Sequence, residues 1–145
     1  MNSAVTCCGS SVNIRATTSA PAQLMVDNGR GQTINVGLSP SSPGFTPLEL
    51  QASALAACIA ASVRIAARNA GVEKLGGVEV DLRATKAEDA PSRLARFEFS
   101  VAFSDDLDPQ LQSKLIEDAE RICTISNTLR SDPPVVISHR VDAKV

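Results

Sequence analysis

The feature that most constrains this chain is a long stretch without charge that follows a set of helix-capping residues. Residues 50–63 contain no Asp, Glu, Lys or Arg. Just before them, Thr46 and Glu49 have the spacing of a capping box, and Pro47 stands at the first helical position, where its missing N–H is not needed. Apolar residues lie all round the segment, which predicts a helix buried on most sides that ends near Gly71.

Alternating and turn-forming residues predict strands on both sides of this helix. Asn28-Gly29 is a strong hairpin signal, because both central residues of a type I′ turn need positive φ. After the helix, two segments alternate apolar and polar residues, the period of half-buried strands. A second helix, with one apolar stripe, is expected from Asp108-Pro109 onward. We expect strands at residues 12–17, 23–27, 32–38, 78–84, 95–103 and 135–141.

These elements predict an α+β domain, in which antiparallel sheets pack on a long buried central helix and a second amphipathic helix. The 145 residues suit a single domain, and we find no internal repeat or linker. We therefore expect residues 12–145 to form one domain. Residues 1–11, which include Cys7 and Cys8, are small and polar and are expected to form a flexible tail.

Composition disfavours several classes of protein. The net charge is −2, and the chain has four Phe but no Tyr or Trp, so neither a basic surface nor stacking rings favour nucleic acid. No run reaches the roughly 18 apolar residues that span a membrane, and the N-terminus does not resemble a secretory signal. We expect a cytoplasmic protein, in which cysteines are more often reactive thiols, metal ligands or core residues than structural disulfides.

Two cysteines are candidates for chemistry. Cys58 lies inside the charge-free helix, where a thiol can simply pack as a small hydrophobe. Cys123 follows the second helix, and Ser126 or Asn127 is expected to cap a short helix after it. Backbone N–H groups beside Cys123 would then stabilise a thiolate, so a reactive and a structural role are equally open for this residue.

Other chemistries have little support in the sequence. The cysteines show no Cys-x-x-Cys spacing, and the adjacent pair Cys7 and Cys8 with the single histidine, His139, does not match a zinc site. No Gly-x-Ser-x-Gly elbow accompanies that histidine, which disfavours a serine hydrolase. No Gly-rich phosphate loop is present, and we expect no cofactor.

Two motifs resemble the OsmC/Ohr family, that is, osmotically inducible protein C-like and organic hydroperoxide resistance proteins. Segment 46–50 (TPLEL) followed by segment 54–58 (ALAAC) is similar to the start of that family's central, cysteine-bearing helix. Segment 123–127 (CTISN) is similar to its second motif, Cys-Pro-x-Ser-Asn. The order of the expected elements matches as well, and the resemblance covers the chain from about Val12.

The resemblance implies an intertwined homodimer with active sites at the subunit interface. Cys58 would attack the peroxide bond and become a sulfenic acid, and Cys123 would condense with it to a disulfide. Organic hydroperoxides are the implied substrates. The implied reductant is a thiol, such as the dihydrolipoyl group of a partner protein, and no metal or flavin is needed.

Several positions depart from the family pattern and indicate a divergent OsmC-like branch. The family's glutamate, which holds an activating arginine, directly follows the proline, whereas here Glu49 stands one residue later, about 100° further round the helix. The arginine comes from an N-terminal hairpin, for which Arg15 and Arg30 are the candidates. Thr124 replaces the proline of the second motif.

Two alternatives stay open. One is a binding protein of the same fold, whose cleft holds a small apolar ligand and whose thiols have little or no peroxidase activity. The other is an interaction protein in which the cysteines only pack.

Overall fold

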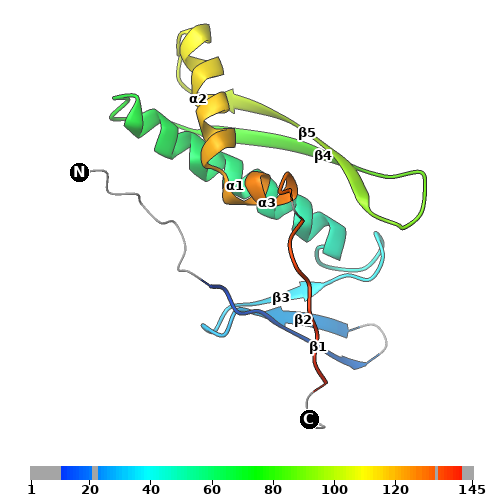
Figure 1. Cartoon of the computed structure of the whole chain (residues 1–145). Helices are drawn as coiled ribbons and strands as arrows, with labels where there is room; N and C mark the ends of the chain where they lie inside the picture. The colour runs from blue at the N-terminus through cyan, green and yellow to red at the C-terminus, as the bar shows by residue number, and fades with distance from the viewer. Residues whose placement is uncertain (1–10, 21–22, 133, 142–145) are drawn as a thin grey trace. The chain divides into compact units, whose positions relative to one another are not determined.

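The computed structural model describes residues 11–20, 23–132 and 134–141 (Figure 1). The chain divides into two compact units after Gln51. The first contains β1 (Arg15–Ala20), β2 (Gln23–Asp27), β3 (Thr33–Val36) and the first turn of α1 (Pro47–Asn69). The second contains the rest of α1, β4 (Val78–Lys86), β5 (Leu94–Phe103), α2 (Pro109–Ile122) and α3 (Thr124–Leu129).

These elements confirm the α+β class. That residues 12–145 form one domain stays a prediction, and the expected tail, residues 1–11, lies outside the described residues except for Ser11.

The first unit is an antiparallel sheet in the order β1-β2-β3. The hairpin expected at Asn28-Gly29 is present, but its turn is longer than a two-residue type I′ turn. The Asn28 carboxamide oxygen accepts hydrogen bonds from the backbone N–H groups of Arg30 at 2.9 Å and Gln32 at 3.3 Å. Positive φ angles occur at Gly29 and Gly31 but not at Asn28, so the glycines supply the left-handed positions.

The helix α1 begins and ends as its sequence predicts. Glu49 donates its backbone N–H to the Thr46 hydroxyl at 3.3 Å, and its carboxylate accepts the Thr46 backbone N–H at 2.7 Å. Both halves of the capping box are therefore formed. After the helix, Gly71 has a φ of 82° and the Val72 N–H bonds to the Ala67 carbonyl at 2.9 Å, the pattern of a Schellman motif.

We expected no segment that could span a membrane, but α1 is long and apolar enough to do so by length and composition alone. That property does not distinguish a membrane span from the core helix of a soluble protein. Six of its side chains are buried inside the protein: Leu55, Ile59, Ser62, Val63, Ala66 and Ala67.

The second unit is built around α1, with the β4–β5 hairpin and α2 gathered along it (Figure 1). The two strands pair antiparallel, with Leu82 opposite Phe99. Their apolar residues share one face, as period-two alternation requires. That face packs on the buried residues Leu55, Ile59 and Val63 of α1 through the partly buried side chains Val78, Val80, Leu82, Phe97, Phe99, Val101 and Phe103.

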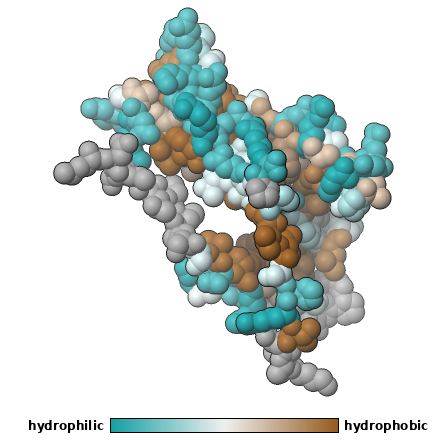
Figure 2. Space-filling model, in the orientation of Figure 1, coloured by the Kyte–Doolittle hydropathy of each residue, from teal (hydrophilic) through white to brown (hydrophobic). Residues whose placement is uncertain are grey.

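The amphipathic helix expected after residue 108 is α2. Asp108 caps it by accepting the backbone N–H groups of Gln110 at 2.9 Å and Leu111 at 3.2 Å. Leu115 and Ala119 are fully buried. The outer face of α2, at the top of Figure 2, is mostly hydrophilic, so the helix has a single core-facing stripe.

The strand expected at residues 135–141 is wrong. Residues 134–141 have no regular secondary structure, and the side chains of Val136 and Ile137 are each 92% exposed. A strand needs a neighbour to pair with its backbone, and β propensity alone does not supply one. Among the described residues, this segment carries the most exposed apolar run.

Burial of α1 is also narrower than its sequence predicts. Leu55, Ile59 and Val63 face the core, whereas Ala54, Ala57 and Ala61 are exposed. The second unit therefore covers one side of this apolar helix, and the exposed alanines on the other side form a stripe that we call the alanine face.

Candidate active site

Cys123 stands at the corner between two helices. It is the C-cap of α2 and the N-cap of α3. Its backbone N–H bonds to the Ala119 carbonyl at 2.9 Å, and its sulfur accepts the Ser126 backbone N–H at 3.3 Å. The cap of the short helix is therefore Cys123 itself, and the expectation that Ser126 or Asn127 would cap it is wrong.

Cys58 reaches the same place from α1. It is half-buried and packs against the core cluster that contains Leu55, Ile59, Ala119 and Cys123. Both cysteines are free thiols, and Cys58 lies close enough to Cys123 to affect the pKa of its thiol. The structure thus brings together the two cysteines that the sequence singled out, although they lie on elements far apart in the chain.

The electrostatics of the pair favour a neutral Cys123. Burial first, and the neighbouring Cys58 thiol second, raise the pKa of the Cys123 thiol from 9.0 to about 11. The backbone N–H groups of Ser126 and Ile125 act in the opposite direction. Since no part of Cys123 is exposed, loss of solvation dominates, and the thiol stays protonated at neutral pH until a chemical event changes its surroundings.

One carboxylate oxygen of Glu49, Oε2, serves the helix cap. Its carboxylate accepts hydrogen bonds from the Thr46 backbone N–H at 2.7 Å and the Thr46 hydroxyl at 2.9 Å, and these two bonds lower the pKa of Glu49. The side chain is exposed. Capping accounts for its geometry, and a catalytic role for Glu49 stays a prediction.

The two candidate arginines belong to the first unit. Arg15 is the first residue of β1, is exposed, and lies opposite Asp27 on β2. Arg30 is exposed in the β2–β3 turn. A part in catalysis stays a prediction for both.

The corner around Cys123 is held by contacts that the sequence alone did not suggest. The Asn127 carboxamide donates to the Arg121 carbonyl at 3.0 Å, and the Arg130 guanidinium pairs with Glu120 at 2.7 Å. Both contacts join α3 or its end to the last turns of α2. The second motif drew attention to Asn127 in the sequence, but nothing in the sequence predicted that its partner is the Arg121 carbonyl.

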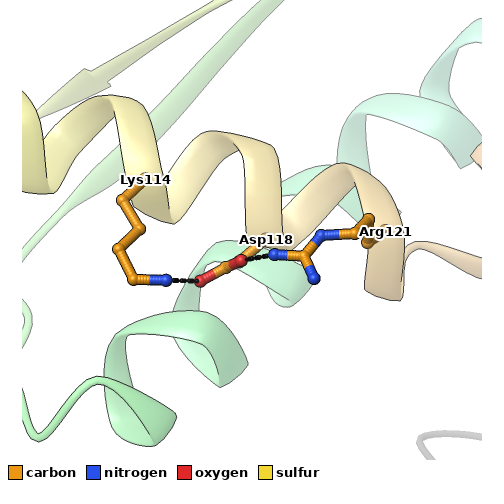
Figure 3. A network of polar contacts seen from close by, with 3 residues as sticks. All are labelled: Lys114, Asp118 and Arg121. Atoms are coloured by element: carbon orange, nitrogen blue, oxygen red, sulfur yellow. Dashed lines mark hydrogen bonds and ion pairs between the residues drawn. The ribbon is translucent and has the colours of Figure 1, made fainter.

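A polar network lies on the outer face of α2 next to this corner. Asp118 lies between Lys114 and Arg121 and binds both (Figure 3). The hydrogen bond from Lys114, at 2.9 Å, is the largest cause that lowers the pKa of Asp118. The network orders Arg121 in the last turn of the helix, where a positive charge also favours the helix dipole.

Within the described part of the chain, His, Cys, Asp and Glu side chains form no group of three or more that could hold a metal ion. The arrangement that can do chemistry is the thiol pair: the half-buried Cys58 packs against the apolar core cluster that contains the fully buried Cys123.

Comparison with known proteins extends this result. The family model described as OsmC-like protein matches residues 39–138. The crystal structure of an OsmC-like protein from Mycoplasma pneumoniae is 17% identical, with a TM-score of 0.75, over 85% of this chain and 89% of that one. No curated protein matches the sequence.

Two further structures have the same fold. The organic hydroperoxide resistance protein OhrB of Bacillus subtilis is 20% identical, with a TM-score of 0.64, over 84% of this chain and 92% of that one. An organic hydroperoxide resistance protein from Elizabethkingia anophelis is 18% identical, with a TM-score of 0.70, over 84% and 89%. Identities this low establish a shared fold, and the activity has to be argued from the site.

Proposed function

Because this chain belongs to the OsmC-like protein family, we propose that it is a thiol-dependent peroxidase that reduces organic hydroperoxides. The observation that supports this most strongly is that Cys58 packs against the core cluster that contains Cys123. Two thiols can cycle through a disulfide only if they lie close together in the fold. Two of the structures with this fold are named organic hydroperoxide resistance proteins, which agrees with the proposal.

We assign the attack on peroxide to Cys58, because it is the more exposed of the two sulfurs. The Cys58 thiolate attacks one peroxide oxygen, the O–O bond breaks, and the leaving alkoxide takes a proton and departs as the alcohol. The sulfur is oxidised to sulfenic acid while the peroxide is reduced.

Cys123 carries out the second step. Its sulfur attacks the Cys58 sulfenic acid, the S–S bond forms, the S–O bond breaks, and the hydroxyl leaves as water with the proton from Cys123. A raised pKa suits this order, since a neutral Cys123 does not compete for peroxide while Cys58 is reduced. An external dithiol then supplies two electrons and two protons, restores both cysteines and is itself oxidised to a disulfide.

The surroundings favour an apolar peroxide. The side chains near the pair are Leu55, Ile59, Ala119 and Ile125, with the aromatic rings of β5 on the same cluster. Such a lining binds an alkyl or aryl group better than it binds water-like hydrogen peroxide.

Three parts of the proposal rest mainly on the family. An arginine, Arg15 or Arg30, is proposed to favour the Cys58 thiolate, because a nearby cation stabilises that form. OsmC-family proteins are typically dimers, and we propose a homodimer for this chain, supported by the exposed alanine face of α1. We propose a cytoplasmic location and a dithiol reductant such as a dihydrolipoyl group.

The test is to give the reduced protein one equivalent of cumene hydroperoxide and map its thiols by mass spectrometry. Substituting serine for Cys7 and Cys8 removes the other two sulfurs from the readout. We expect a Cys58–Cys123 disulfide, no peroxide consumption in Cys58→Ala, and a trapped Cys58 sulfenic acid in Cys123→Ala.

Unchanged thiols after peroxide treatment would contradict the proposal. The alternative is then a binding protein for a small apolar ligand, and native mass spectrometry of the purified protein would look for that ligand.

A further inference from the structure

Asn127 holds the backbone on both sides of Cys123. Its own N–H bonds to the Cys123 carbonyl at 3.0 Å, and its carboxamide donates to the Arg121 carbonyl, also at 3.0 Å. The last four carbonyls of a helix have no partner further along that helix, so Arg121 depends on a group from outside α2. Asn127 is that group.

The two bonds fix the direction in which the Cys123 side chain leaves the chain. Cys123 has φ −64° and ψ 110°, a non-helical conformation between two helical segments. If the Arg121 carbonyl lost its partner, the last turn of α2 would be free to fray, and the Cys123 thiol would move with it. The sulfur would then sample positions away from Cys58.

We infer that Asn127 is a positioning residue for the resolving step, which holds the Cys123 sulfur in line with Cys58. This inference rests on the proposed roles of the two cysteines. Asn127 does not touch either reacting atom, and it acts through the backbone at Arg121 and Cys123.

Because Asn127 is exposed, its positioning role can be tested separately from an effect on the stability of the fold. The side chain is exposed, so shortening it opens no cavity in the core. A second contact, the ion pair between the exposed Arg130 and the half-buried Glu120, joins the end of α3 to α2 but binds neither the Arg121 carbonyl nor Cys123. It provides a matched control, because its loss removes a contact between α2 and α3 without releasing the carbonyl next to the cysteine.

The experiment measures closure of the disulfide without peroxide, in the full chain with serine at positions 7 and 8. Cys58 is loaded with Ellman's reagent, 5,5′-dithiobis(2-nitrobenzoate), which releases one thionitrobenzoate. Attack by Cys123 on that mixed disulfide releases the second, and its rate reports how well Cys123 is placed.

We expect Asn127→Ala to slow the second release roughly tenfold while the first keeps the parental rate, since small displacements of a reacting group carry large rate penalties. Asn127→Asp keeps the shape but lacks the donor, and should be slowed at least as much. Arg130→Gln should behave like the parent. Circular dichroism and thermal unfolding would verify that each variant is folded at the assay temperature.

Parental closure rates in both Asn127 variants would overturn the inference. So would equal slowing in Arg130→Gln, because the effect would then belong to the general docking of α3. A parent that closes with Ellman's reagent but not with cumene hydroperoxide would refute the proposed peroxidase while leaving the positioning role intact.

Discussion

At the scale of single residues, Cys123 combines two functions that are usually separate. Helix N-caps are normally Ser, Thr, Asp or Asn, whose oxygen accepts a backbone N–H strongly. Here a sulfur, a weak acceptor, occupies the position and binds the Ser126 N–H. The sulfur cap therefore stabilises α3 less than an oxygen cap would. In return, the cap holds the Cys123 thiol at a fixed position.

The pKa of Cys123 leads to a prediction for stability against pH. A folded-state pKa raised from 9.0 to about 11 means that the fold favours the neutral thiol. This contribution is complete below pH 9 and is lost as pH rises toward 11, by at most roughly 2–3 kcal/mol for a shift of this size.

Urea unfolding in the presence of a phosphine reductant, between pH 8 and 11, would measure that loss. The Cys123→Ala variant should be less stable at pH 8, yet should lose less stability over the same range. Parallel losses in the two proteins would mean that other groups account for the titration.

Exposure predicts the order in which the two thiols react. Cys58 is half-buried, and Cys123 has no exposed surface. Iodoacetamide at pH 8 should modify Cys58 at least about tenfold faster than Cys123, since alkylation needs an accessible thiolate. Peptide mapping over time measures both rates, and a faster Cys123 would show that the α2–α3 corner opens readily.

Contacts between residues close together in the sequence could be predicted, whereas contacts between distant residues could not. The Thr46–Glu49 capping box was predictable because its partners are three residues apart. The proximity of Cys58 and Cys123 requires α1 to pack on α2, which no local pattern specifies, and only resemblance to a family suggested the pair. The partner of Asn127 was missed for the same reason.

At the scale of elements, the cap of α1 determines where that helix begins. Replacing Thr46 by Ala should lower the free energy of unfolding by about 1 kcal/mol, because it removes the N-cap oxygen. Glu49→Gln should nearly preserve the midpoint of thermal unfolding, since Gln also serves in a capping box, whereas Glu49→Ala should lower it.

Equal destabilisation by Gln and Ala would show that the charge of Glu49 matters and not only its hydrogen-bonding oxygen. With stability preserved in Glu49→Gln, any loss of peroxide consumption in that variant would assign the carboxylate a part in the chemistry.

The elements also show where sequence patterns are insufficient. Strands β4 and β5 follow their alternation, because each supplies the other with a partner. Residues 135–141 are equally apolar but have no regular secondary structure, and the expected strand is wrong. Likewise, the absence of charge in α1 predicted burial on most sides, but how much of a helix is covered depends on the partners available.

At the scale of the whole molecule, the alanine face of α1 predicts association. Ala54, Ala57 and Ala61 are exposed in the single chain, and small residues let another backbone approach closely. We expect light scattering to give the mass of two chains, and Ala61→Arg to reduce it to one. Ser113→Arg, on the exposed side of α2, is the control and should keep the mass of the parent.

A parental mass in Ala61→Arg would contradict the use of this face. A chain that is monomeric before any substitution would contradict the proposed homodimer itself.

Once the two sulfurs join, everything between residues 58 and 123 becomes a closed loop. In the chain-entropy model, a crosslink over a loop of this size lowers the conformational entropy of the unfolded state. This stabilises the folded protein by roughly 4 kcal/mol. The oxidised protein should therefore withstand heat and proteases better than the reduced one. Each turnover would pass through a more stable, crosslinked form. The reductant that restores the two thiols would also return the protein to its less stable form.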